Sequence, residues 1–274
     1  VRGQRAPHGT FPRRLKPSAM CLIVLRWQPG SLIVAANRDE FHHRPTAPLS
    51  FWPDAPRVLA GRDLQSGGTW LGTTRDGRFA ALTNYRDPSR QRDDARSRGH
   101  LVSGFLAGDE DVHRYAARVQ REGRTCNGFN LLLYDGASLL WVGHQPASEV
   151  SVGELSPGVH ALSNHLPGTP WPKLLRARTG FTGALEQQSA QPALFDRLFR
   201  VLSDETPADD ADLPDTGVGL EWERRLSPVF IRGDAYGTCS SAVLELTAQR
   251  IDFEERRYRS GGLYAGSTHI DFER

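Results

Sequence analysis

The sequence has 274 residues, a formal net charge of +2 and an isoelectric point near 8.6. Its length is compatible with one larger domain or two small ones. The three cysteines form no CxxC pair, which excludes a disulfide framework and a zinc-knuckle spacing, and no apolar run reaches the length of about 18 residues that a membrane-spanning helix needs. We therefore expect a cytoplasmic protein without a transmembrane segment.

Residues 1–19 differ in composition from the rest of the chain. They hold five basic residues and no acidic one, so residues 20–274 carry a net charge of −3 and the basic isoelectric point does not indicate nucleic-acid binding. The segment lacks the apolar core of a secretory signal, and its three prolines disfavour an amphipathic helix. We expect residues 1–19 to be a disordered basic leader or a start-site artefact, and residues 20–274 to form a single domain.

The predicted elements begin with a β-hairpin, because the apolar runs 22–27 and 32–36 flank the turn sequence Gln28-Pro29-Gly30-Ser31. Residues 41–66, with four prolines, and residues 204–217, with six acidic residues, are expected to be irregular. Further strands are predicted at 69–73, 78–85, 129–134, 139–143, 150–152, 159–163, 238–247 and 250–259. Helices are predicted at 98–107, 110–122, 171–188 and 192–203. Strands followed by helices and again by strands, without βαβ alternation, predict an α+β fold with mostly antiparallel sheets.

Met20 is the only methionine in the chain, and it is followed directly by Cys21. If the methionine is an initiator and is removed, Cys21 carries a thiol and a free α-amino group on one residue. The amine titrates near ~7.7–8.0 and the thiol near ~8.5, so a nucleophile and a base share one site at neutral pH. The alternative is that Cys21 simply begins a strand.

Four polar residues, Asn37-Arg38-Asp39-Glu40, follow the second apolar run, and we expect them to project from the end of the sheet. The end of the second strand of an antiparallel hairpin returns beside the start of the first, so Cys21 and the Arg38/Asp39 pair are predicted to be neighbours. Arg38 can favour the thiolate, and Asp39 can orient the amine or a substrate group. The alternative is a solvated turn with a surface ion pair worth about 0–1 kcal/mol.

Several further blocks occur in order along the chain, and together with Met20-Cys21-Leu22-Ile23 and Asn37-Arg38-Asp39-Glu40 they resemble the NRDE family, also called the transport and Golgi organisation protein 2 family. The resemblance spans roughly residues 20–245. The blocks are Gly67-Gly68-Thr69-Trp70-Leu71-Gly72, Thr83-Asn84-Tyr85-Arg86, Ser97-Arg98-Gly99, Phe129-Asn130-Leu131-Leu132, Leu162-Ser163-Asn164-His165, Pro170-Trp171-Pro172-Lys173 and Tyr236-Gly237-Thr238.

The resemblance implies a four-layer αββα sandwich of the N-terminal-nucleophile hydrolase type. Cys21 matches the nucleophile of such proteins, Arg38 and Asp39 approximate their Arg/Asp pair, and Asn84 and Asn164 match their two asparagines. An amide N–H of either asparagine can donate to a tetrahedral oxyanion, a contact worth about 3–4 kcal/mol. The alternative for each asparagine is a turn residue that bonds its own backbone.

One position departs from the family pattern: Gly237-Thr238 is followed by Cys239, where the family usually has arginine. If that arginine binds an anionic substrate group, this chain takes a different ligand or lacks the contact, and Cys239 can equally be a buried core residue. The adjacent His42 and His43 point apart on an extended chain and have no third ligand at useful spacing, so no metal site is predicted.

Two functions remain open at this point. The first is a cysteine N-terminal-nucleophile amidohydrolase or acyltransferase that acts on a small acyl amide without a cofactor. The second, also implied by the resemblance, is a non-catalytic haem- or lipid-handling protein in which Cys21, His42 or His165 touches a non-covalently bound haem; no CxxCH is present for covalent attachment. Either function implies a small-molecule ligand, and the sequence carries no signal for an oligomeric state.

Overall fold

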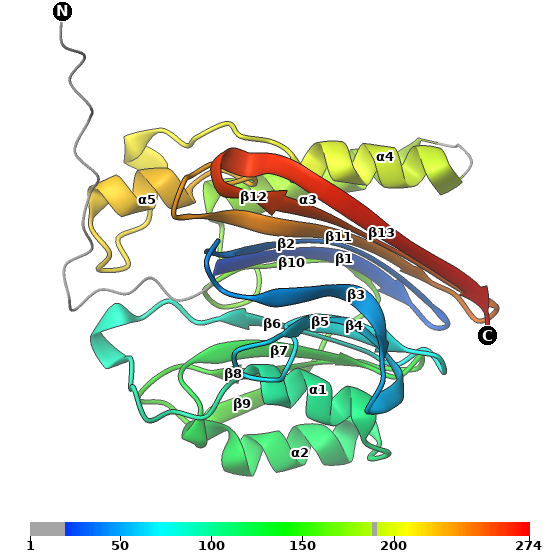
Figure 1. Cartoon of the computed structure of the whole chain (residues 1–274). Helices are drawn as coiled ribbons and strands as arrows, with labels where there is room; N and C mark the ends of the chain where they lie inside the picture. Colours follow the sequence, from blue (N-terminus) through cyan, green and yellow to red (C-terminus); the bar gives the residue numbers. More distant parts are fainter. Residues whose placement is uncertain (1–19, 188–190) are drawn as a thin grey trace, which may run out of the picture.

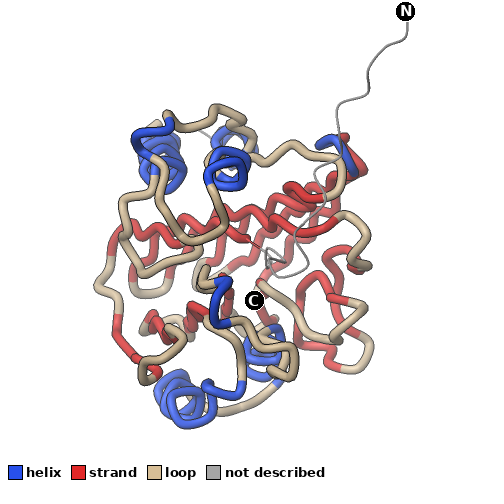
Figure 2. The backbone as a smooth tube through the Cα atoms, turned by 90° about the vertical axis from the view of Figure 1, so that its left-hand side faces the viewer, coloured by secondary structure: helices blue, strands red, loops and turns tan. Residues whose placement is uncertain are grey.

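Two antiparallel sheets lie face to face between two layers of helices in the computed structural model, which describes residues 20–187 and 191–274 (Figure 1). The side view shows the helices at the two outer faces of the sheets (Figure 2). The expected αββα sandwich with α+β composition is therefore confirmed. The predicted leader, residues 1–19, and residue 188 of the predicted third helix lie outside the described residues.

The strands form one six-stranded and one seven-stranded sheet, and every pairing between named strands is antiparallel. The six-stranded sheet has the order β10 (Gly158–Leu162), β1 (Met20–Gln28), β2 (Ser31–Phe41), β11 (Tyr236–Leu246), β12 (Arg250–Arg259) and β13 (Leu263–Glu273). The seven-stranded sheet runs from β3 (Thr46–Trp52) through β4 (Ala55–Asp63), β5 (Leu71–Thr74), β6 (Phe79–Asn84), β7 (Phe129–Tyr134) and β8 (Leu139–His144) to β9 (Val150–Glu154).

The helices divide between the two outer faces. Those packed on the seven-stranded sheet are α1 (Gly99–Ala107) and α2 (Val112–Glu122), and those packed on the six-stranded sheet are α3 (Pro172–Glu186) and α4 (Gln191–Leu202) (Figure 1). A short α5 (Leu220–Leu226) lies beside one end of the sandwich. Among the helices of the described residues, none is long and apolar enough to cross a membrane.

Three apolar layers hold the sandwich together, and strand alternation explains them. On β1, Ile23 and Leu25 point into the layer between the sheets, whereas Leu22 and Val24 point toward α3 and α4. A third layer joins the seven-stranded sheet to α1 and α2 around residues such as Phe105. Both faces of β1 and β2 are therefore buried, as their nearly continuous apolar runs require.

Residues 41–66 are not irregular as expected, because they form β3 and β4. The prolines that suggested a loop are accommodated by strand position: β3 is an edge strand, and Pro48 lies where the register between β3 and β4 shifts, between Ala47 and Ser50. An edge or bulge position does not need the missing N–H. The loop expectation for 204–217 holds except for a 3-10 turn at Asp210–Asp212.

The expected opening hairpin is confirmed, with one difference that determines the site. Strand β2 does not end before Asn37 but continues through the polar residues to Phe41, because it pairs with β1 on one side and with β11 on the other. Cys21 lies opposite Arg38, and Met20 lies opposite Asp39. The polar residues are thus 0–6% exposed members of a central strand, and they do not form a solvated turn.

Candidate active site

Strand alternation sends the four polar residues of β2 to opposite faces of the six-stranded sheet. Asn37 and Asp39 face the helix layer: the amide nitrogen of Asn37 donates to the carbonyl oxygens of Leu202 and Val229 at 2.8 and 2.9 Å. Arg38 and Glu40 face the space between the sheets, where they line a cavity. Of the predicted Arg/Asp pair, only Arg38 is therefore in the cavity.

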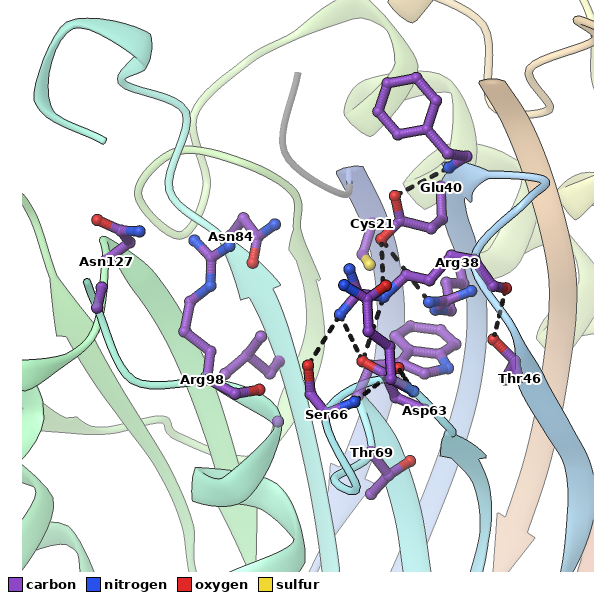
Figure 3. A pocket seen from close by; sticks show the side chains of 18 of the residues that line it. Cys21, Arg38, Glu40, Thr46, Asp63, Ser66, Thr69, Asn84, Arg98 and Asn127 are labelled. Carbon is purple, nitrogen blue, oxygen red and sulfur yellow. Dashed lines mark hydrogen bonds and ion pairs between the residues drawn. The ribbon is translucent and has the colours of Figure 1, made fainter. Parts of the chain in front are cut away.

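The cavity has a volume of about 730 Å³ and opens at the end of the sandwich where β1 begins. Cys21 is one of the residues that line it (Figure 3). Figure 3 shows Arg38 and Glu40 on one side of the thiol, and Asn84 and Arg98 on the other. The structure thus brings together three of the five predicted site residues, one from each of β1, β2 and β6.

The Cys21 thiol is buried in the chain that retains Met20. Cys21 is 3% exposed, and burial together with the negative charge of Asp39 raises the pKa of its thiol to about 12, against the opposing effect of Arg38. The carbonyl oxygen of Cys21 accepts a hydrogen bond from Ser163 at 2.9 Å, which fixes the backbone at this point. In this form the thiol is un-ionised at neutral pH.

The two predicted asparagines occupy different positions. Asn84 ends β6 and lines the cavity. Asn164 follows β10 in the opposite sheet and is 1% exposed; its amide nitrogen donates to the backbone carbonyl of Asn84 at 3.0 Å, and its own carbonyl accepts from the backbone N–H of Arg86. Asn164 therefore connects the two sheets and holds Asn84 in place, and it is not among the residues that line the cavity.

One wall of the cavity is rich in arginine. Arg92, Arg96 and Arg98 have no carboxylate within 4.0 Å among the described residues, whereas Arg44, on the opposite wall, pairs with Asp63 at 2.6 Å. Arg98 donates to the carbonyl of Gly128, and burial lowers the pKa of its guanidinium to about 10. Five arginines and three carboxylates line the cavity in all, so an anionic ligand group is favoured there.

Of the other residues noted in the sequence, Cys239, His42 and His165 lie outside this cavity, whereas His43 lines it. Cys239 sits at a bulge of β11 and contacts His42 Nδ1 at 3.5 Å, while His42 Nε2 contacts the carbonyl of Gly233. His165 contacts Thr169 and stacks against the aromatic rings beside it. Within residues 20–187 and 191–274 no group of three or more His, Cys, Asp or Glu side chains is placed to hold a metal ion.

The residues named for haem do not fit a haem site. His42 and His165 do not line the cavity that Cys21 lines, and most side chains around that cavity are polar or charged. A haem needs apolar faces and an axial ligand directed at the iron. Of the three residues considered for haem from the sequence, Cys21 therefore lines the cavity and the two histidines do not.

Sequence reasoning missed the buried residues behind the site. Arg86 and Lys173 were noticed only as members of family blocks, and Glu223 was not noticed; all three are at most 6% exposed. A lysine in the first turn of a predicted helix gives no local sign that it will be buried. Only the tertiary structure places these charges next to Asp39.

The fold and the site together define a four-layer αββα sandwich with a cavity at its open end that is lined by Cys21, the second residue of β1. The family model described as "Transport and Golgi organisation 2" matches residues 20–260. The chain belongs to the transport and Golgi organisation 2 family. It is 37% identical to the mouse homologue and 39% identical to the bovine one over 262 residues, covering 86% of this chain and 92% of each relative.

Solved structures with some similarity to the chain include two hydrolases. One is a Caenorhabditis elegans N-acylethanolamine-hydrolyzing acid amidase ortholog, 10% identical with a TM-score of 0.46 over 82% of this chain and 92% of that one. The other is a mutant conjugated bile acid hydrolase from Clostridium perfringens, 12% identical with a TM-score of 0.45 over 93% of this chain and 92% of that one.

Proposed function

We propose that the protein is a cysteine N-terminal-nucleophile amidohydrolase or acyltransferase. The observation that carries this proposal is the position of Cys21, the second residue of β1, which lines the cavity of about 730 Å³ with Arg38 on one side of it and Asn84 on the other. A nucleophile, a cation and an amide donor around one cavity are the groups that acyl transfer requires.

The proposed reaction begins when the chain up to Met20 has been removed. The free α-amino group of Cys21, directly or through one water, takes the thiol proton, and the sulfur attacks the acyl carbon of the amide. Asn84 donates to the oxyanion, the C–N bond breaks, and the leaving amine receives the proton. Water then hydrolyses the thioester to a carboxylic acid, or an acceptor amine or alcohol takes the acyl group.

The electrostatics of Cys21 favour this order of events. A buried thiol with a pKa of about 12 has almost no thiolate at neutral pH, so Cys21 is a poor nucleophile while Met20 is attached. Removal of Met20 supplies a base on the same residue and takes away a 1% exposed side chain next to it. The nucleophile is then activated only in the processed chain.

The arginine-rich wall narrows the substrate class. Arg92, Arg96 and Arg98 face the ligand space without a carboxylate partner among the described residues. An acyl substrate with an anionic group at the end remote from the reacting carbonyl gains a charge-assisted contact there. We therefore expect anionic acyl amides to be better substrates than neutral, purely aliphatic ones.

The test is to incubate the protein that begins at Cys21 with a panel of neutral and anionic acyl amides and to search for an acyl-enzyme by intact-mass spectrometry. We expect a mass increase that peptide mapping assigns to Cys21, absent in Cys21→Ala and retained in Cys126→Ala, whose thiol lies in the apolar layer under α1 and α2. An adduct that survives in Cys21→Ala, or no adduct with any amide, contradicts the proposal.

The alternative of a haem- or lipid-handling protein is supported less well, because the cavity is polar and the named histidines lie outside it. Titration of haem into wild-type protein and Cys21→Ala separates the two functions. A Soret shift that requires Cys21 supports the alternative, whereas an unchanged spectrum in both proteins removes haem.

A further inference from the structure

Four charged side chains lie buried behind Cys21, outside the catalytic roles proposed above. Asp39 comes from β2, Arg86 follows β6, Lys173 is the second residue of α3, and Glu223 comes from α5; none is more than 6% exposed. Two are acidic and two basic, so the cluster is neutral when all four are ionised. Buried charges at this density are costly unless they are paired.

The two possible pairs in this cluster are not equivalent. Arg86 and Glu223 form a close ion pair, with guanidinium and carboxylate 2.7 Å apart. Lys173 Nζ has no hydrogen-bond partner among the described residues, and neither has Asp39 Oδ2, whereas Asp39 Oδ1 accepts from Thr238 at 2.7 Å. Lys173 and Asp39 therefore make no hydrogen bond to each other, and their charges interact only through longer-range electrostatics.

Burial and the dipole of α3 both disfavour the protonated, charged form of Lys173. It is 2% exposed, and it lies in the first turn of α3, where the helix dipole disfavours a cation. Burial lowers the pKa of its ammonium to about 8, and Asp39 is the strongest factor working against that change. Burial likewise raises the pKa of Asp39 to about 6, and the charge of Lys173 opposes this most strongly.

The start of β1 lies directly over this pair. Met20 is opposite Asp39 in the β1–β2 register. The backbone N–H of Met20 donates to the Tyr236 hydroxyl at 3.0 Å, and that hydroxyl donates to the backbone carbonyl of Asp39 at 3.2 Å. Once Met20 is removed, the α-amino group of Cys21 becomes the first group of the strand, one residue from the position opposite Asp39 and within electrostatic reach of Lys173.

We propose that Lys173 is a positioning residue for the Cys21 centre: its buried ammonium opposes the charge of Asp39 at the released α-amino group and keeps that amine in its free-base form at neutral pH. The inference rests on the proposed function. A cation near an amine disfavours protonation of that amine, which is how neighbouring cations activate amine bases in other enzymes. The free-base amine can then accept the Cys21 thiol proton.

Other charged and titratable groups also surround this point. Arg86 is neutralised by Glu223, and Arg38, on the opposite face of β2, lies 3.7 Å from Glu40. Burial keeps the pKa of Tyr236 well above its ordinary value, so its hydroxyl stays neutral. Among the described residues, the carboxylates of Asp39 and Glu40 favour an α-ammonium here, and the cations Arg38 and Lys173 oppose it.

The experiment labels the protein that begins at Cys21 with [15N]cysteine and follows the α-nitrogen chemical shift of Cys21 with pH. In the wild type we expect a midpoint below the ordinary ~7.7 of an α-amine. In Lys173→Met the midpoint rises by about one pH unit, because the opposing cation is gone and Asp39 remains. Lys173→Arg keeps the charge and leaves the midpoint close to that of the wild type.

A wild-type midpoint at or above the ordinary value overturns the inference without any variant, as does a folded Lys173→Met protein whose midpoint is unchanged. A merely structural role for Lys173 lowers the melting temperature in both variants and moves neither midpoint. The proposed function is tested by a different readout: it is contradicted if no acyl-enzyme forms on Cys21, whatever the pH midpoint of the α-amine.

Discussion

At the scale of single residues, the polar end of β2 combines structural and chemical roles on alternate side chains. Asn37 and Asp39 make hydrogen bonds on the helix-facing side of the sheet, whereas Arg38 and Glu40 line the cavity. The family block Asn37-Arg38-Asp39-Glu40 is therefore two interleaved sets of residues, and substitutions within it are expected to have different consequences.

Asn37→Ala is predicted to reduce stability without acting on the cavity directly. The change removes two hydrogen bonds to the carbonyls of Leu202 and Val229 and one from the hydroxyl of Ser241, all of them buried. We expect the free energy of unfolding to fall by about 2–4 kcal/mol, as measured by urea denaturation. The control is Asn127→Ala, whose amide bonds the backbone of Arg92 at an exposed site and costs less than about 1 kcal/mol. Equal losses in the two variants contradict this role.

Asn84→Ala is predicted to reduce turnover. Loss of an oxyanion donor lowers kcat by about 10²–10³-fold, whereas KM changes little, because the contact strengthens only as the oxyanion forms. The measurement is steady-state kinetics on an acyl amide that forms the Cys21 acyl-enzyme. Gln65→Ala, an exposed amide on the rim of the same cavity, is the matched control. An unchanged kcat in Asn84→Ala removes this residue from the proposed mechanism.

At the scale of elements, a close backbone contact positions the arginine-rich wall. Gly68, in the loop before β5, packs against Gly99 at the start of α1, and the backbone N–H of Thr69 donates to the carbonyl of Gly99. A Cβ atom on Gly68 would lie 2.6 Å from the carbonyl carbon of Gly99. The loop thereby fixes the first turn of α1 and, with it, the adjacent Arg98.

Gly68→Ala is accordingly predicted to be destabilising and to displace the start of α1. We expect a loss of about 1–3 kcal/mol in unfolding free energy, since backbone atoms must move to relieve the overlap. Gly183→Ala is the opposite control: this glycine lies within α3 with nothing near its Cβ position, and alanine there stabilises the helix by up to about 1 kcal/mol. Thermal unfolding of both variants checks the signs, and a neutral Gly68→Ala contradicts the contact.

Local patterns explain which elements were predictable. The hairpins β1–β2, β5–β6 and β7–β8, and the helices α1 to α4, follow from apolar periodicity and turn residues over short stretches, and the neighbourhood of Cys21 and Arg38 follows from hairpin register. Strand β3 was missed because prolines are tolerated at an edge, and α5 and β13 were missed because no strong local period marks them. The roles of Lys173 and Asn164 depend on contacts across sheets and helices, which no local pattern contains.

At the scale of the whole molecule, the sandwich makes the reactivity of Cys21 depend on where the chain begins. The two sheets and α5 enclose the start of β1, and with Met20 attached burial raises the pKa of the Cys21 thiol to about 12. The same enclosure buries Asp39, which lies opposite Met20, together with Lys173. Under the proposed function, removal of the preceding residues completes this centre.

The chain that retains Met20 is predicted to react slowly with iodoacetamide at Cys21. At pH 8 a thiol with a pKa of about 12 has a thiolate fraction of about 10⁻⁴, roughly 10³-fold less than an ordinary cysteine, and the rate rises about tenfold per pH unit up to pH 12. Peptide mapping separates Cys21 from Cys126 and Cys239. Alkylation of Cys21 at the rate of an exposed cysteine contradicts its burial.

The most direct test of the central claim compares two forms of one protein, one beginning at Cys21 and one retaining Met20, each verified by intact mass and incubated with the same anionic acyl amide. We predict a thioester adduct on Cys21 in the first form and none in the second, because the proposed mechanism needs a free α-amine to take the thiol proton. Equal acylation of Cys21 in both forms contradicts the terminal-amine mechanism.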